Sequence, residues 1–373
     1  MTGRLLLFVL VLMPGWFLLL RYYFFDPFIM KNIPYGLGGK KRNLLDIYLP
    51  FKRTAVADGG EKKMKKPTGP VIIFLSGGAW IIGYKMWACL LAREFARFGY
   101  IVVCPDYRNF PQGNIEDMVA DTIAALSWTK THIELFGGDP NQIILSGQSA
   151  GAHIAACTVM HLYKASSYKS KLRQLNLAGI PAPALDGMVT PKKSSDEEEE
   201  EWEEWRSKSR TSSEVEYLVT IDDVKMFVGI SGPYNLKALE AHFHNRGLDS
   251  AIIEWICLRD VKKYSPTHVL ADIIGHAVPC SNKTLEGFPA VALFHGCQDV
   301  TIPASVSTEL FSLLEAAGVQ GPVLKLYKDC SHTDAILEGV LSGDCQMLRD
   351  VAEVIYTSLD KCPKLNGPKQ STY

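Results

Sequence analysis

The sequence lacks the features of several common protein classes. Its nine cysteines are scattered and none forms a C-x-x-C pair, so neither a disulfide framework nor a zinc site is expected. The formal net charge is only −1, which argues against a nucleic-acid-binding surface. No internal repeat is apparent. We therefore predict no metal, no cofactor and no nucleic-acid partner.

The composition is that of a globular protein with a large core. The chain has 373 residues, of which 47% are hydrophobic and 21% charged. Residues 163–215 interrupt this composition with irregular sequence that includes the acidic run 196–201. A run of like charges repels itself and stays solvated, so we predict a disordered surface insertion, with a functional acidic patch as the alternative. The main domain is expected over residues 40–360.

An apolar run extends from Leu5 to Leu20, and aromatic residues continue it to Phe25. Sixteen helical residues span ~24 Å, somewhat less than a ~30 Å hydrocarbon core. No small-residue cleavage site follows, which favours a transmembrane anchor at residues 5–25 over a cleaved signal peptide. More lysines and arginines follow the run than precede it, so we predict a single-pass membrane protein whose folded domain faces the cytosol.

Short apolar runs alternate with helical patterns through the body of the chain. This order predicts an α/β fold with a mostly parallel central sheet and helices on both faces. A helical stretch over residues 236–270 is expected to form a lid. The predicted strands cover 44–50, 71–75, 100–104, 143–145, 226–230, 290–294 and 323–327, and the other predicted helices cover 86–98, 115–136, 305–317, 348–359 and the residues after 149.

A G-x-S-x-G pattern follows the strand at 143–145, as Gly147-Gln148-Ser149-Ala150-Gly151. The glycines allow a tight strand-to-helix turn that presents the serine hydroxyl above the sheet, at a helix N-terminus that favours negative charge. The sequence therefore predicts a nucleophile elbow with Ser149 as nucleophile. An ordinary glycine-rich turn is the alternative.

A serine hydroxyl needs a base, and the base needs an orienting carboxylate. In the α/β-hydrolase fold, the acid and then the histidine follow the serine, each on a loop after a strand. Asp299 and His332 meet both conditions, whereas Asp329 and Asp334 lie too close to His332 in sequence. We interpret His295 as structural, because it precedes the acid.

Acyl transfer also needs backbone N–H groups that meet the developing oxyanion. The small residues Gly77, Gly78 and Ala79, which follow a predicted strand, and Ala150, directly after the serine, are the candidates. Gln148 is included as a substrate-binding candidate.

These motifs resemble the isoprenylcysteine α-carbonyl methylesterases, which belong to the α/β-hydrolases. The resemblance rests on residues 77–85 (GGAWIIGYK), 106–113 (DYRNFPQG) and 147–155 (GQSAGAHIA). Shorter blocks at 242–247 (HFHNRG) and 332–334 (HTD) support it.

The resemblance implies hydrolysis of the methyl ester on a prenylated C-terminal cysteine, with Ser149, Asp299 and His332 as catalytic triad. It also implies prenylated substrates, a membrane partner, and the endoplasmic reticulum or Golgi as location. Two alternatives stay open: a broader membrane-bound carboxylesterase or deacetylase for small lipophilic esters, and an inactive hydrolase fold that binds a ligand. The candidates for an apolar prenyl groove are Phe28, Trp80, Trp87, Phe110, Phe243 and Trp255.

Overall fold

A computed structural model describes residues 17–35, 42–50, 69–177, 219–247, 249–275, 285–343 and 345–359. Its strands are β1 (Ile29–Pro34), β2 (Leu44–Tyr48), β3 (Gly69–Leu75), β4 (Ile101–Pro105), β5 (Gly138–Gln148), β6 (Val224–Ile230), β7 (Ala290–Gly296) and β8 (Val323–Tyr327). Its helices are α2 (Cys89–Arg97), α3 (Ile115–His132), α4 (Ala150–Leu177), α6 (Leu236–Asn245), α7 (Ser250–Ile256), α8 (Pro266–Gly275), α9 (Ser305–Ala316), α10 (Glu338–Leu341) and α11 (Gln346–Ser358).

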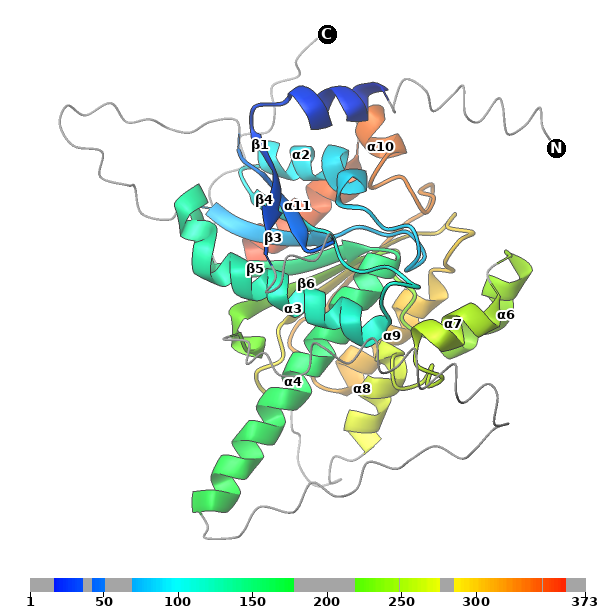
Figure 1. Cartoon of the computed structure of the whole chain (residues 1–373). Coiled ribbons are helices and arrows are strands. Elements are labelled where there is room, and N and C mark those ends of the chain that lie inside the picture. The colour runs from blue at the N-terminus through cyan, green and yellow to red at the C-terminus, as the bar shows by residue number, and fades with distance from the viewer. Residues whose placement is uncertain are drawn as a thin grey trace.

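The strands form one eight-stranded sheet in the order β1-β2-β4-β3-β5-β6-β7-β8 (Figure 1). The pairs β1–β2 and β2–β4 are antiparallel, and every later pair is parallel. All strands predicted from apolar runs are present. Strand β1 was not predicted, because its sequence IMKNIP alternates buried and exposed positions at the sheet edge and contains no apolar run.

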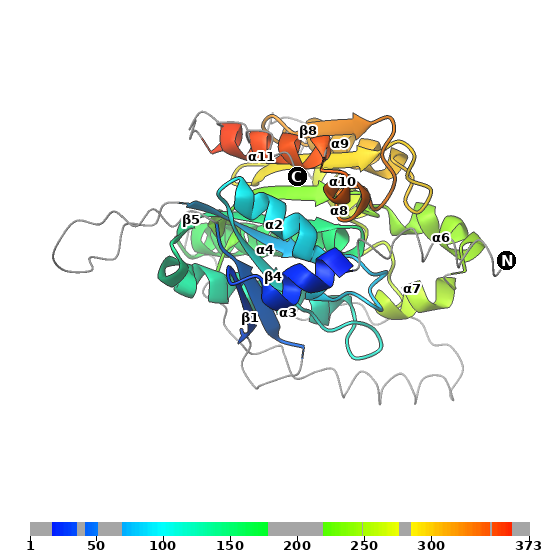
Figure 2. The ribbon, with the colours of Figure 1, turned by 90° about the horizontal axis from the view of Figure 1, so that it is seen from above.

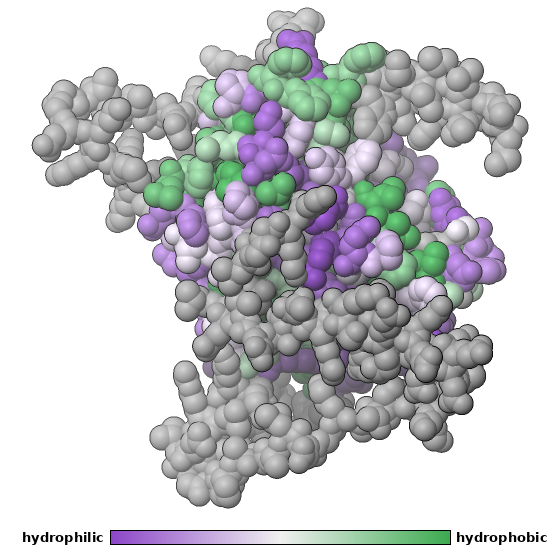
Figure 3. Space-filling view, in the orientation of Figure 1, coloured by the Kyte–Doolittle hydropathy of each residue, from purple (hydrophilic) through white to green (hydrophobic). Residues whose placement is uncertain are grey.

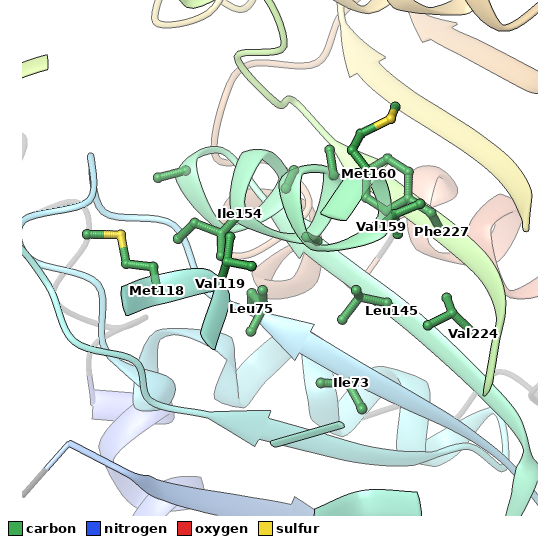
Figure 4. Packing of buried hydrophobic residues seen from close by; sticks show 14 of the residues in the cluster. Ile73, Leu75, Met118, Val119, Leu145, Ile154, Val159, Met160, Val224 and Phe227 are labelled. Carbon is green, nitrogen blue, oxygen red and sulfur yellow. The ribbon is translucent and has the colours of Figure 1, made fainter. Parts of the chain in front are cut away.

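Helices cover both faces of the sheet (Figure 2). Successive residues of a strand point to opposite faces. Val71, Ile73 and Leu75 of β3 accordingly pack with α3, α4, α8 and α9. Ile72 and Phe74 belong to the other layer, with α2 and α11. Figure 4 shows the first layer, where side chains of β3 and β5 face residues of α3 and α4. The predicted α/β-hydrolase architecture is thus confirmed.

Two helical regions differ from the prediction. The stretch 236–270, which was predicted to be helical, forms the separate helices α6 and α7 and part of α8, and α6 and α7 extend beyond the carboxyl ends of the strands (Figures 1 and 2). Helix α4 continues to Leu177, into the first part of the range predicted as an insertion. Residues 178–215 of that range, with the acidic run, lie outside the described residues.

The prediction of a single-pass membrane anchor is wrong. Residues 17–25 form a short helix that packs on the domain: Leu19 and Tyr23 are buried in the core, and the Tyr23 hydroxyl donates to Oδ2 of buried Asp46 at 2.9 Å. In the ranges that the structure describes, no helix is long and apolar enough to cross a bilayer. Without the anchor, the predicted orientation toward the cytosol and the predicted location in the endoplasmic reticulum or Golgi are not supported. Residues 5–16 of the predicted anchor lie outside the described ranges.

Lys85 also holds this helix on the domain. Lys85, which is almost fully buried, lies 2.5 Å from Oδ1 of Asp46 and donates to the Tyr23 hydroxyl at 3.0 Å. The opposite side of the helix exposes Phe17, Leu20, Phe24 and Phe25. Figure 3 shows apolar surface in this region, where the dark-blue helix lies in Figure 1. Leu19, Tyr23 and Ile29 therefore pack in the same core layer as the segments that follow residue 40.

Candidate active site

Ser149 lies at a sharp turn between β5 and α4. Its φ of 55° is in the left-handed region, which is uncommon for a residue other than glycine. Its backbone N–H donates to the carbonyl of Ile230 at 2.9 Å, which fixes the turn against β6. A Cβ at Gly151 would overlap the carbonyl oxygen of Leu75, so only glycine lets α4 start this close to β3. The serine is partly exposed at the carboxyl edge of the sheet.

Asp299 and His332 follow β7 and β8 and meet at the same edge. Nδ1 of His332 lies 2.6 Å from Oδ2 of Asp299, and the other carboxylate oxygen accepts the N–H groups of Thr301 and Ile302. Burial of Asp299 opposes ionisation, but the hydrogen bonds from His295 and His332 and the charge of His332 outweigh it, so the pKa of Asp299 is well below its usual range. The carboxylate is thus ionised and aimed at the imidazole.

Ser149 and His332 are held on neighbouring segments without a direct hydrogen bond between their side chains. Gln148, the residue before the serine, donates from Nε2 to the carbonyl oxygen of His332 at 3.0 Å. This contact braces the histidine loop beside the elbow. The Gln148 amide thus makes a contact within the protein, although the sequence analysis placed Gln148 among the substrate-binding candidates.

Asp334, which the sequence set aside, has a local role. Its Oδ2 accepts the backbone N–H of Ser331 and so stabilises the loop that carries His332. Catalytic hydrogen bonds are often formed only when substrate is present, so the open Ser149–His332 arrangement is compatible with base catalysis.

His295, which the sequence analysis interpreted as structural, is in direct contact with Asp299. Its Nε2 is 3.2 Å from Oδ2 of Asp299 and 2.9 Å from the carbonyl of Ile302, so this nitrogen must carry a proton. Nδ1 then accepts from the Ser307 hydroxyl at 2.7 Å. The sequence feature that indicates this contact is the position of His295 at a strand end, four residues before Asp299.

The loop after β3 approaches the serine from the other side. Gly77 touches the elbow: a Cβ built there would lie 2.9 Å from Cβ of Ser149. Gly78 and Ala79 follow with φ values of 135° and 50°. Among the described residues, no hydrogen bond takes up the N–H of Gly78 or Ala79. The N–H of Ala150 lies in the first turn of α4, where helical N–H groups have no partner within the helix.

The six aromatic candidates do not gather at one place. Trp80 and Phe243 are buried and in ring contact, at 6.2 Å between centroids. Phe110 and Trp255 form a second contact at 6.4 Å, and Trp255 is half exposed. Phe28 immediately precedes Ile29, which pairs with Tyr48 beside the amino end of β4. Phe28 therefore lies at the opposite edge of the sheet from Ser149, and its prediction as a groove residue is wrong.

In the part of the chain that the structure describes, no group of three or more histidine, cysteine or acidic side chains is arranged so that it could hold a metal ion. The polar groups at this edge instead comprise one hydroxyl, one imidazole–carboxylate pair and free backbone donors. This set of groups is suited to attack on a carbonyl carbon.

Comparison with known proteins gives relatives over most of the chain. The sequence model of the BD-FAE family matches residues 45–314. A probable isoprenylcysteine alpha-carbonyl methylesterase from Oryza sativa subsp. japonica is 35% identical over 355 residues, which are 95% of this chain and 70% of the relative. The isoprenylcysteine alpha-carbonyl methylesterase of Arabidopsis thaliana is 34% identical, over 94% of this chain and 67% of its own length.

Solved structures share the fold at low sequence identity. A truncated carbohydrate esterase from gut microbiota superposes with a TM-score of 0.56 at 18% identity, covering 89% of this chain and 96% of that one. A thermophilic esterase from Thermogutta terrifontis with propionate bound has a TM-score of 0.56 at 20% identity, covering 92% and 99%. At this level of identity the likeness speaks for the fold alone.

Proposed function

Because this chain belongs to the isoprenylcysteine α-carbonyl methylesterase family and is a serine esterase of α/β-hydrolase fold, we propose that it hydrolyses the methyl ester of prenylated cysteine. The products are methanol and a free prenylcysteine carboxylate. The substrate is either a small prenylcysteine ester or the C-terminus of a protein.

In the proposed mechanism Ser149 attacks the ester carbonyl while Nε2 of His332 takes the hydroxyl proton. Asp299, already bonded to Nδ1, keeps the imidazole in the required tautomer and stabilises the imidazolium that forms. The imidazolium then returns the proton to the departing methoxide. Water, activated by the same imidazole, attacks the acyl-enzyme and releases the carboxylate, which regenerates Ser149.

The N–H groups of Gly78, Ala79 and Ala150 are the proposed oxyanion hole. The residues that carry them are glycine and alanine, so no large side chain keeps a substrate carbonyl away from these N–H groups. Preorganised donors of this kind stabilise the tetrahedral intermediate because they need no reorientation during the reaction.

A rim of exposed apolar side chains carries the assignment of a prenyl substrate. Ile82 in the loop after β3 is 67% exposed, Val300 beside Asp299 is 68% exposed, and Trp255 on α7 is 50% exposed. The Phe110 ring makes an edge contact with the Trp255 ring, and the Phe110 N–H donates to the Trp80 carbonyl at 2.8 Å. Each of these residues is attached to a segment at the carboxyl edge of the sheet. We call Ile82, Phe110, Trp255 and Val300 the apolar rim.

Helices α6 and α7 are proposed to act as the lid over this rim. Nε2 of His242 on α6 lies 2.9 Å from the carbonyl of Thr301, two residues after Asp299, and Phe243 packs on Trp80. Helix α6 thus contacts both the acid loop and the proposed oxyanion loop, and α7 contacts Phe110 through Trp255. They are placed to cover an acyl chain once it has bound.

A pair of esters with identical reacting groups tests the substrate. N-acetyl-S-farnesylcysteine methyl ester and N-acetyl-S-methylcysteine methyl ester differ only in the S-alkyl chain. Each buried methylene contributes about 0.8 kcal/mol, so burial of four to five carbons predicts a kcat/KM about 100-fold or more in favour of the farnesyl ester. Equal values for the two esters would refute prenyl recognition.

A broader carboxylesterase for small lipophilic esters is the second candidate, because exposed apolar side chains such as Ile82 and Val300 do not by themselves require a prenyl chain. A higher kcat/KM for short acyl esters than for the farnesyl ester would favour it. An inactive, ligand-binding hydrolase is separated from both by fluorophosphonate labelling. Labelling of the wild type, and its absence in Ser149→Ala with an unchanged Tm, is the expected result.

A further inference from the structure

Trp80 is the anchoring residue of the loop that carries Gly78 and Ala79. Its side chain is only 3% exposed, and its ring makes edge-on contacts with His153 at 5.3 Å and with Phe243 at 6.2 Å. Its indole Nε1–H donates to Nδ1 of His153 at 3.2 Å. Its carbonyl accepts the N–H of Phe110 at 2.8 Å.

His153 is fully buried and has a defined tautomer. Because the indole can only donate, Nδ1 of His153 must be the bare nitrogen. Nε2 therefore carries the proton and lies 2.6 Å from the carbonyl oxygen of Tyr264, which accepts it. Burial lowers the pKa of His153 to about 4, so the ring remains neutral and able to accept at neutral pH.

His153 also lies one helical turn after the serine. Its N–H donates to the Ser149 carbonyl at 3.1 Å, in the first turn of α4. His153 therefore sits in the first turns of the helix that begins directly after Ser149. The hydrogen bond to Trp80 therefore ties the loop after β3 to the same helix that presents Ser149.

The segment that carries the Gly78 and Ala79 N–H groups is thus held on both sides. Gly77 contacts Ser149 at one end, and Trp80 is bonded to His153 at the other. Between them Ala79 has a φ of 50°, and Trp80 itself has a φ of 61°. A left-handed conformation is strained for a residue with a side chain. Burial and hydrogen bonding of the Trp80 side chain act against this strain.

We propose that His153 is a positioning residue that, through the Trp80 indole, holds the Gly78 and Ala79 N–H groups in register with Ser149. The inference rests on the proposed assignment of these N–H groups as oxyanion donors. His153 touches no reacting atom. It acts by fixing where the loop lies, and Tyr264 fixes the orientation of its ring.

The test uses the full chain and p-nitrophenyl butyrate, whose hydrolysis does not depend on prenyl recognition. Trp80→Phe keeps an aromatic ring but removes the donor, and His153→Leu removes the acceptor. Because a displaced oxyanion donor costs about 10- to 100-fold, we expect each variant to lose that factor in kcat with KM within about 2-fold. The variant that lacks both groups should lose no more than the worse single variant, because the two changes break one bond.

A reversible trifluoromethyl ketone inhibitor gives a second readout. Addition of Ser149 to this ketone produces a tetrahedral oxyanion, so its inhibition constant should weaken by a factor similar to the loss in kcat. His153→Asn, whose side-chain oxygen can replace Nδ1, is expected to keep kcat within about 3-fold. If His153→Leu does not fold, as judged by its thermal transition, Trp80→Phe and His153→Asn still decide the question.

The matched control is a tryptophan–histidine pair away from the site. Trp128 and His132 on α3 stack at 4.9 Å, and Trp128→Phe should leave kcat and inhibition unchanged. Wild-type kcat and inhibition in both Trp80→Phe and His153→Leu would overturn the inference, as would a loss in His153→Asn equal to that in His153→Leu. A failure of prenyl selectivity in the paired-ester assay would leave these ratios intact, so the two proposals fail separately.

Discussion

Nδ1 of His332 lies 2.6 Å from Oδ2 of Asp299, across the ends of the neighbouring strands β7 and β8. The bond fixes the ring so that Nε2 faces away from the acid. Asp299→Asn is expected to lower kcat about 10⁴-fold, because the amide stabilises the wrong tautomer and leaves the imidazolium without a counter-charge. The control is Asp329→Asn, an exposed carboxylate three residues before the histidine, for which we expect wild-type kcat. Comparable losses in the two variants would contradict the assignment of Asp299.

A methyl group at Gly77 should disrupt the site. The added Cβ would lie 2.5 Å from Oε1 of Gln148 and 2.9 Å from Cβ of Ser149, closer than real contacts allow. We expect Gly77→Ala to lower kcat by about 100-fold or more, since the loop must move away from the serine. Gly275→Ala, at the end of α8 with no atom near the added Cβ, is the matched control and should be neutral. Steady-state kinetics with equal Tm values separate the effect on the site from a loss of folding.

The apolar rim should control selectivity between the paired esters. Replacing the half-exposed Trp255 by serine removes a large apolar contact, and burial of such a side chain contributes about 1.5–3 kcal/mol. We expect kcat/KM for the farnesyl ester to fall about 10- to 100-fold while the value for the short ester changes less than about 2-fold. Leu135→Ser, which replaces another exposed apolar residue outside the rim, should change neither. A parallel fall for both esters would show that Trp255 supports the fold rather than the prenyl chain.

His153 should make stability depend on pH in a defined window. Its pKa is lowered to about 4 by burial, against an ordinary value near 6.5. Between these values the unfolded chain binds a proton that the folded chain excludes, so stability is complete above about pH 6.5 and declines as the pH falls toward 4. The loss reaches roughly 3 kcal/mol and stays constant at lower pH. Denaturant unfolding of wild type and His153→Asn across pH 4–7 measures it, and a pH-independent difference between the two would disprove the account.

Much of the sheet could be predicted because buried parallel strands have a simple pattern. Val71–Leu75 is an uninterrupted apolar run, residues 226–230 are apolar except for Gly229, and both strands lie inside the sheet, away from its edges. The residues of the candidate site were found for a related reason: a parallel sheet brings the carboxyl ends of its strands to one edge, so Ser149, Asp299 and His332 could be placed together from strand order alone.

The contacts that sequence could not reveal are polar pairs between distant segments. Nothing in the spacing of Trp80 and His153 indicates that their nitrogens meet, and the link between Tyr23 and Asp46 is equally hidden. An apolar helix has the same composition whether it packs on protein or in lipid. Only the buried partners, Asp46 and Lys85, distinguish the two cases for residues 17–25.

The docked N-terminal helix has a practical consequence for handling the protein. Trimming the chain back to residue 26, as one would to remove a presumed anchor, would strip Leu19 and Tyr23 from the layer they share with α2 and α11. It would also remove the Tyr23 hydroxyl, which accepts a hydrogen bond from Lys85 and donates one to Asp46. Shortened versions prepared for crystallisation or assay should therefore start upstream of Phe17, and poor recovery of a version starting at Asp26 would reflect a damaged fold.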